Sequence, residues 1–270
     1  MMNRVLFAIS TIVLAVSVAA QTGGKAPKRF VISDYRALAD GSTVNTKAIQ
    51  SAIDNCAASG GGVGVVPKGT FLSGAIFLKQ GVNLLVEKDG VLKRTTNFDD
   101  YPLINTRWEG TEEPWTSSFV NAEGMTDLEI SGEGTIDGSG EEWLQNSGQG
   151  RGQAGRGAAG ASGATRPPGP PQQRRGRPRL VGIQNSKRVQ VAGLNLHNQA
   201  VWCLFILYSE DVLAENLHIT AEHNIPSSDG IDIDSSKRVR VNNVYIDVND
   251  DCISIKSGKD ADGLRVNRPA

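Results

Sequence analysis

The sequence predicts an all-β chain folded as a parallel β-helix, a solenoid with one capping helix near its start. Three observations support this fold class. The second half of the chain repeats itself, the first half holds a single helical pattern followed by many short strand patterns, and glycine is frequent at 31 of 270 residues. Glycines between short apolar runs are typical of a turn-rich β protein.

The repeat is the strongest of these signals. NSKRVQVAGLNLHN, YSEDVLAENLHITA and SSKRVRVNNVYIDV align without gaps, at steps of 23 and 27 residues, and LEISGEGTID at 128–137 is a looser earlier copy. Each unit reads as two short alternating strands joined by a polar turn, and one unit alone cannot bury its apolar face. A period of this size indicates a solenoid. The leucine and asparagine framework of leucine-rich repeats is missing, which leaves a parallel β-helix. The predicted inward positions are Val189, Val191, Leu194, Leu196, Val212, Ala214, Leu217, Ile219, Val239, Val241, Val244 and Ile246.

The first half predicts the cap of this solenoid. TKAIQSAIDNCAA places Ala48, Ile49, Ala52, Ile53 and Cys56 on one helical face, and the glycines at 60–62 end the helix. VGVVP, FLSGAIFL and VNLLVE follow as short strand patterns. We expect the helix to cover the open first coil, whose backbone groups and apolar interior would otherwise face water.

Composition and the N-terminal stretch limit the function classes. Hydrophobic residues make up 39% and charged residues 21%, so we expect a real core, and the formal net charge of −1 does not indicate a nucleic-acid partner. Residues 1–20 read as a signal peptide with cleavage after Ala20. The alternative is a membrane anchor, but the apolar run is short for a bilayer. We therefore expect a soluble protein that is secreted or periplasmic, without stable membrane insertion.

We divide the mature chain into 21–146, with the cap and first coils, an insertion at 147–179, and central coils at 180–270. The insertion is rich in glycine and proline and holds seven arginines and no acid, so we expect it to be disordered. The remaining chain carries 21 basic and 29 acidic residues, a balance of −8. A cationic loop could hold a polyanionic substrate, although a solvated insertion without function is the simpler interpretation.

The three cysteines, Cys56, Cys203 and Cys252, are too few and too widely spaced for a disulfide framework. No cysteine–histidine pair has the spacing of a zinc site. We expect three buried free thiols.

Three carboxylates are candidates for chemistry. Asp229 stands in a tight turn, and the pair Asp250 and Asp251 follows about one coil later. Residues one coil apart in a parallel β-helix stack at the strand spacing of roughly 4.8 Å, so the three can converge on one groove. Neighbouring carboxylates raise one another's proton affinity, which allows one to act as an acid and another as a base in glycoside hydrolysis. The alternative is that these aspartates only satisfy the backbone of turns.

The same segments carry a family resemblance. SSDGIDIDSS followed by NDDCISIKSG resembles the polygalacturonases and related enzymes of glycoside hydrolase family 28, as do the opening FVISDYRALADGSTVNTKAIQSAIDNCAASGGGVGVVPKGTFLSG and the middle segments SGEGTIDGSGEEW and RPRLVGIQNSKRVQVAGLNLHNQAVWCLFILYSEDV. The resemblance covers nearly all of the mature chain except the insertion. It implies a right-handed parallel β-helix that hydrolyses α-1,4-galacturonosyl bonds in pectin.

By this resemblance Asp250 is the general acid, and Asp229 and Asp251 activate water from the opposite side, with inversion at the anomeric carbon. Ser227 and Lys256, which lie in the same two motifs, are predicted to bind substrate. No metal and no cofactor is implied. The expected partner is a pectic polysaccharide, acted on by a monomer.

The chain also departs from the family pattern. Ser227 and Ser228 stand where Asn-Thr is usual, and Phe205 stands where relatives often have histidine. The family continues with Gly-His-Gly and Arg-x-Lys motifs, which do not occur before Ala270, and the three histidines, at 197, 218 and 223, lie upstream of the aspartate pair. We therefore expect a C-terminally incomplete β-helix, the front two-thirds of an enzyme, with very weak or no hydrolysis and poor solubility by itself.

Two other functions fit the same scaffold. A polysaccharide lyase would use calcium held by acidic residues and a basic arginine or lysine, and a non-catalytic β-helix would bind pectin without cleaving it. The sequence does not separate endo from exo action or galacturonan from rhamnogalacturonan. The short IKSG ending of the second motif slightly favours exo action, by resemblance only.

Overall fold

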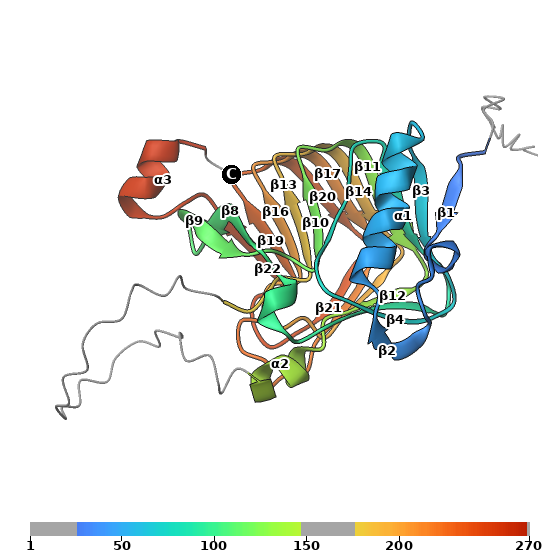
Figure 1. Cartoon of the computed structure of the whole chain (residues 1–270). Coiled ribbons are helices and arrows are strands. Elements are labelled where there is room, and N and C mark those ends of the chain that lie inside the picture. Colours follow the sequence, from blue (N-terminus) through green and yellow to red (C-terminus); the bar gives the residue numbers. More distant parts are fainter. Residues whose placement is uncertain (1–25, 147–175, 269–270) are drawn as a thin grey trace, which may run out of the picture.

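The computed structural model describes residues 26–146 and 176–268. Their strands form three parallel sheets, with each coil of the chain adding a strand to successive sheets (Figure 1). The architecture is a parallel β-helix, as predicted.

The first sheet has seven strands, in the order β1 (Arg29–Val31), β3 (Gly62–Val66), β6 (Val82–Val86), β11 (Thr126–Gly132), β14 (Lys187–Ala192), β17 (Glu210–Glu215) and β20 (Lys237–Asn242). The second sheet also has seven, in the order β2 (Asp40–Val44), β4 (Gly69–Ser73), β7 (Gly90–Arg94), β12 (Thr135–Asp137), β15 (Asn195–His197), β18 (His218–Thr220) and β21 (Tyr245–Asp247). The third sheet has six, in the order β5 (Ile76–Phe77), β10 (Val120–Glu123), β13 (Val181–Gln184), β16 (Leu204–Leu207), β19 (Ile231–Asp234) and β22 (Ile253–Lys256).

Outside these sheets lie one antiparallel hairpin and several short helices. The hairpin consists of β8 (Leu103–Trp108) and β9 (Thr111–Thr116). The helices are α1 (Thr46–Ala58), α2 (Gly140–Asn146), α3 (Asp260–Val266) and the 3-10 turns η1 (Ile32–Tyr35) and η2 (Phe98–Asp100). None of the described helices is long and apolar enough to cross a lipid bilayer.

Strand pairing confirms that the three aligned repeats are consecutive coils. Val189 pairs with Val212 and Val212 with Val239 in the first sheet, while Leu196, Ile219 and Ile246 pair in the second. Each aligned unit holds two strands as predicted, for example β14 and β15, and each complete coil also supplies a third strand that lies outside the aligned units. In two of these third strands burial does not alternate, since all four residues of β16 and all four of β19 are buried.

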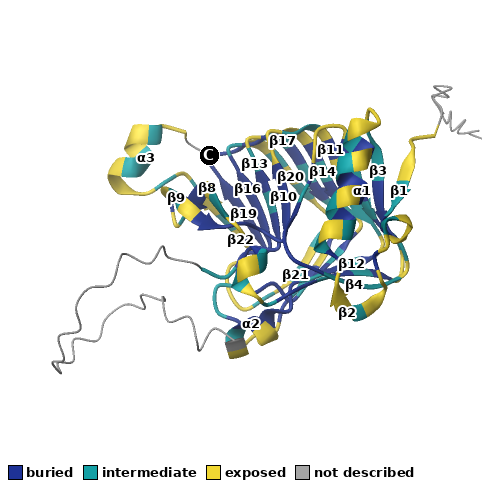
Figure 2. Cartoon of the chain, in the orientation of Figure 1, coloured by how far each residue is buried: buried dark blue, intermediate teal, exposed yellow. Residues whose placement is uncertain are grey.

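The core fills the space enclosed by the three sheets (Figure 2). The predicted inward residues of the first two repeats are buried, whereas Val239, Val241, Val244 and Ile246 of the third are half-buried. Within 26–146 and 176–268, no further coil packs over β20, β21 and β22. Ile255 on β22 is accordingly 71% exposed.

The capping helix is confirmed. Ile49, Ala52, Ile53 and Cys56 are buried on its inner face, and α1 packs against strands of the first coils, including β1, β3 and β5. Its end follows the predicted glycines, since the amide of Gly61 donates to the carbonyl of Cys56 at 3.0 Å with a left-handed φ of +99°. That conformation favours glycine because it has no Cβ.

Two expectations need correction. The insertion was predicted to reach residue 179, but residues 176–179 are part of the fold and Arg179 is only 2% exposed. The thiols of Cys56 and Cys203 are free and buried as expected, whereas Cys252 is exposed because it lies on the outermost described coil. The predicted signal peptide and residues 147–175 lie outside the described residues.

Candidate active site

The three candidate carboxylates lie in two turns that stack directly on one another at the start of β19 and β22. Ile231 pairs with Ile253, so Asp229 and Asp251 each stand two residues before a paired position. The amide of Gly230 donates to the carbonyl of Asp251 at 2.9 Å, and the amide of Asn249 donates to the Ser228 hydroxyl at 3.2 Å. The two turns are therefore one strand spacing apart, as the sequence predicts.

The preceding coil holds the Asp229 turn from the other side. The buried Gln199 amide donates to the carbonyls of Ser228 and Asp229 at 3.0 and 3.2 Å, and the Cys203 amide donates to the Asp229 carbonyl at 2.9 Å. Ser227 enters this turn with a left-handed φ of +58°, which is uncommon for a residue other than glycine. The backbone under Asp229 is thus fixed by both neighbouring coils.

The carboxylates differ in their surroundings. Asp229 is 5% exposed, whereas Asp250 and Asp251 are exposed and the amide of Asp251 donates to the Asp250 carboxylate at 3.0 Å. Burial raises the pKa of Asp229, and the charge of Asp250 raises it further, while the ammonium of Lys256 opposes both effects. The site therefore combines one buried carboxyl and two accessible ones.

A fourth carboxyl, Asp232 on β19, completes the buried part of the site. It is fully buried, and burial followed by the charge of Asp229 raises its pKa to about 7 against the influence of Lys256. Lys256 on β22 forms an ion pair with Asp232, and its ammonium lies 3.7 Å from the Asp229 carboxylate. Lys256 thus bridges both buried carboxyls.

Tryptophan side chains lie next to Lys256. The Lys256 ammonium lies 3.5 Å from the centroid of the Trp202 ring, a cation–π contact. Trp202 stacks on Trp108 with centroids 4.5 Å apart, and Trp108 stacks on Trp115 at 4.4 Å. We call Trp108, Trp115 and Trp202 the tryptophan stack. It joins the β8–β9 hairpin to the coil beneath the carboxylates.

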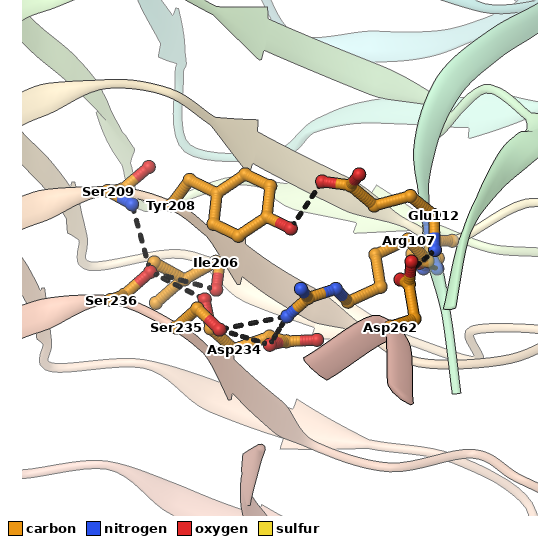
Figure 3. Close-up of polar contacts among 10 residues, drawn as sticks. Arg107, Glu112, Ile206, Tyr208, Ser209, Asp234, Ser235, Ser236 and Asp262 are labelled. Atoms are coloured by element: carbon orange, nitrogen blue, oxygen red, sulfur yellow. Dashed lines mark hydrogen bonds and ion pairs between the residues drawn. The ribbon is translucent and has the colours of Figure 1, made fainter. Parts of the chain in front are cut away.

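The hairpin is fixed to the outward face of the third sheet by a buried ion pair. The Arg107 guanidinium donates to the Asp234 carboxylate at 2.7 Å and to the Ser235 hydroxyl at 2.8 Å, with both charged side chains 1% exposed (Figure 3). Figure 3 also shows Tyr208 donating to Glu112 of β9, a contact of 2.7 Å. A cavity of about 70 Å³, lined in part by Ile104, Gly182 and Phe205, remains beneath the hairpin.

Arg179 also links the β8–β9 hairpin to the third sheet. Its guanidinium donates to the carbonyl of Arg107 at 2.5 Å and lies 3.9 Å from the centroid of the Phe205 ring. Phe205, which stands where relatives often carry histidine, is therefore part of a buried arginine–aromatic packing. Burial lowers the pKa of Arg179, and Asp232 and Asp234 oppose this shift.

Sequence reasoning named Asp229, Asp250 and Asp251, but it did not name Asp232, Trp202 and Gln199, which the structure places beside them. One signal was available for Asp232: the alternation in IDID places two acids on one face of a strand. Nothing local marked Trp202 or Gln199, since their partners lie on other coils. Among the residues that the structure describes, no group of three or more histidine, cysteine, aspartate or glutamate side chains could hold a metal ion.

Comparisons with known proteins show which proteins this chain is similar to. The chain is 29% identical over 245 residues to a probable polygalacturonase of Vitis vinifera, covering 87% of this chain and 46% of that protein. It is 28% identical to an exo-poly-alpha-D-galacturonosidase of Dickeya chrysanthemi, covering 88% of this chain and 44% of that protein. The chain thus spans about half the length of these relatives.

A solved structure of a polygalacturonase is also similar to this chain. The exopolygalacturonase from Thermotoga maritima matches with a TM-score of 0.73 and 28% identity, covering 91% of this chain and 59% of that chain. The family model described as glycosyl hydrolases family 28 matches residues 56–267, which contain every residue of the site. This chain belongs to glycosyl hydrolase family 28.

Proposed function

We propose that this chain is the part of an exported pectin hydrolase that carries three aspartates of its active site. Its reaction is the inverting hydrolysis of α-1,4-galacturonosyl bonds by a monomer. The observation that carries the proposal is the stacking of the Asp229 turn on the Asp250–Asp251 turn with unequal burial of the three carboxyls. The family relatives named polygalacturonase support the substrate class.

In this proposal Asp250 protonates the leaving oxygen, while Asp229 and Asp251 activate a water molecule from the opposite side of the sugar. Asp250 is exposed and reaches substrate without rearrangement. Asp229 must be ionised to act as a base, so its raised pKa would define the acid limb of the pH profile. Ser227, two residues before Asp229 in the same turn, is proposed to contact the sugar.

The hairpin favours action near a chain end. It covers the outward face of the third sheet at β13, β16 and β19, where Asn105 accepts from Gln184 at 2.9 Å and Arg107 pairs with Asp234. The tryptophan stack stands beside Lys256 at the edge of the carboxylate turns. A polysaccharide lying over Asp229 and Asp250 would meet this wall on one side, so we propose exo action.

The test is an assay of polygalacturonate with this chain and with the longest product of its gene. A hydrolase releases reducing ends without an unsaturated product, and NMR shows inversion at the anomeric carbon. Exo action releases short products while viscosity falls slowly. Calcium-dependent formation of unsaturated, ultraviolet-absorbing ends would show a lyase instead, and absence of cleavage by either form would overturn the proposal.

The acid is tested by Asp250→Asn. We expect the hydrolysis rate to fall roughly 10²- to 10⁴-fold, because this is the usual contribution of general acid catalysis. Pectin binding should persist. Asp89→Asn, a change at an exposed residue of the β6–β7 turn, is the matched control and should leave the rate unchanged. Equal rates in the two variants would remove Asp250 from the mechanism.

A further inference from the structure

Lys256 does not lie as a free cation in the groove. Its ammonium is paired with the fully buried Asp232, stands 3.7 Å from Asp229 and covers the Trp202 ring at 3.5 Å. Its side chain is only 22% exposed. Each of these contacts lies on a different coil from Lys256, since Trp202 precedes β16 and Asp232 belongs to β19. Lys256 therefore connects three consecutive coils at the base of the site.

The charge balance of this group is uneven. One ammonium serves two buried carboxyls, and one oxygen of Asp232 is buried without a hydrogen-bond partner among the described atoms. A substrate carboxylate brought to Lys256 would also approach the carboxylate of Asp229. Like charges at short distance repel in a poorly solvated site, so this position suits a uronate poorly.

We propose that Lys256 is a positioning residue that holds the Asp229 carboxylate ionised and oriented, with Asp232 as the anchor that holds Lys256 in place. This inference rests on the proposed function, because Asp229 is there the base. It differs from the expectation that Lys256 binds substrate.

The surrounding charges determine the effect of removing Lys256. Asp229 faces Lys256, Asp232 and Asp250, and Asp232 also faces Arg179 and the buried thiol of Cys203. Of these groups, Lys256 is the one whose charge lowers the pKa of both Asp229 and Asp232. Without it, burial and the charge of Asp250 act on Asp229 with their largest opposing influence removed. The pKa of Asp229 rises, and the base is protonated over more of the acid range.

The first experiment needs no catalytic activity. Reductive methylation followed by peptide mass spectrometry measures how fast each lysine reacts. Lys237, an exposed lysine at the start of β20, is the internal control. We expect Lys256 to react several-fold more slowly than Lys237 in the wild-type protein and to become reactive in Asp232→Asn. Equal reactivity of the two lysines in the wild type would contradict the proposal that Asp232 anchors Lys256.

The second experiment uses whichever form of the protein hydrolyses polygalacturonate. For Lys256→Met we expect kcat to fall by roughly 10²-fold through misplacement of the base, and the acid limb to move up by about one pH unit or more. KM should stay near the wild-type value, Lys256→Arg should restore the acid limb, and Lys237→Met should change nothing.

A substrate-binding lysine gives a different pattern: KM rises, while kcat and the acid limb stay unchanged. That pattern would overturn the proposal. If no form of the protein hydrolyses polygalacturonate, the proposed function fails and this inference fails with it, even if labelling shows that Asp232 anchors Lys256.

Discussion

The first and third sheets both pair their strands in parallel, but the charged side chains on their outward faces differ in burial. Those of the first sheet contact water, whereas those of β19 in the third sheet are buried. On the first sheet, Asp127, Arg188, Asp211 and Arg238 occupy equivalent positions of successive described coils, all with left-handed backbone. Asp211 is half-buried and the other three are exposed. On the third sheet, Asp232 and Asp234 lie beneath the hairpin or Lys256 and are fully buried.

These four residues form a ladder of alternating charge on the first sheet. Arg188 donates to Asp127 at 2.5 and 2.8 Å, and Arg238 donates to Asp211 at 2.6 and 3.2 Å. These hydrogen bonds lower the pKa of Asp127 and Asp211. Burial raises the pKa of Asp232 instead. The comparison teaches that stacking alone does not raise the pKa of a carboxyl, whereas a cover that excludes water does.

The largest expected effect separates a buried from an exposed arginine. Arg107→Met leaves Asp234 buried without its partner, which should lower the free energy of unfolding by about 3–5 kcal/mol. Arg188→Met removes an exposed ion-pair partner of Asp127, and the free energy of unfolding should fall far less. Urea unfolding followed by tryptophan fluorescence is a suitable measurement, because Trp108 and Trp115 belong to the hairpin. Similar losses in the two variants would break the comparison.

The next effect concerns pH. The pKa of Asp232 is raised from 3.8 to about 7, so the folded state binds a proton that the unfolded state has released. The stability due to this carboxyl is complete below pH 3.8 and falls as pH rises to about 7, by up to roughly 4 kcal/mol.

We expect Asp232→Asn to remove this part of the pH dependence. Unfolding free energies of the wild type and the variant, measured from pH 4 to 8, should therefore converge or cross rather than remain parallel. Parallel curves would show that Asp232 keeps the same proton affinity in the folded and unfolded states.

The smallest expected effect concerns the ladder of alternating charge. Its contribution to stability increases with pH, whereas that of Asp232 decreases. The lowered pKa of Asp211 contributes stability that is present above pH 3.8 and is lost as pH falls through the folded-state value. Asp211→Asn should therefore weaken the protein slightly at neutral pH and not at strongly acid pH. Thermal unfolding at low and high salt is the measurement. A loss that salt does not reduce would show that the ladder acts by packing and not by charge.

The sequence predicted the parts of the fold that depend on local periodicity. The capping helix and the paired strands of the first and second sheets show their apolar period directly, and Asp229, Asp250 and Asp251 stand in turns whose stacking follows from the coil length. These parts require no knowledge of distant contacts.

The third sheet could not be predicted in this way, because its outward face is not solvated. The residues of β19 are buried from one side by the core and from the other by groups far along the chain, such as Arg107, which is 127 residues from Asp234. For the same reason, Arg179 was assigned to a disordered insertion on composition, although its guanidinium packs on Phe205. Contacts with residues so far along the chain leave no mark in the local sequence pattern.

The unequal coil lengths have a consequence for how such a site can change over evolution. Val189 and Val212 are 23 residues apart and Val212 and Val239 are 27 apart, yet both pairs are in register. Residues can therefore be gained or lost in the corners while the strands stay paired. The separation of the Asp229 and Asp251 turns is set by the strand spacing and not by the number of residues between them. Corner insertions can thus change the surface around these turns while the distance between the turns is inherited unchanged.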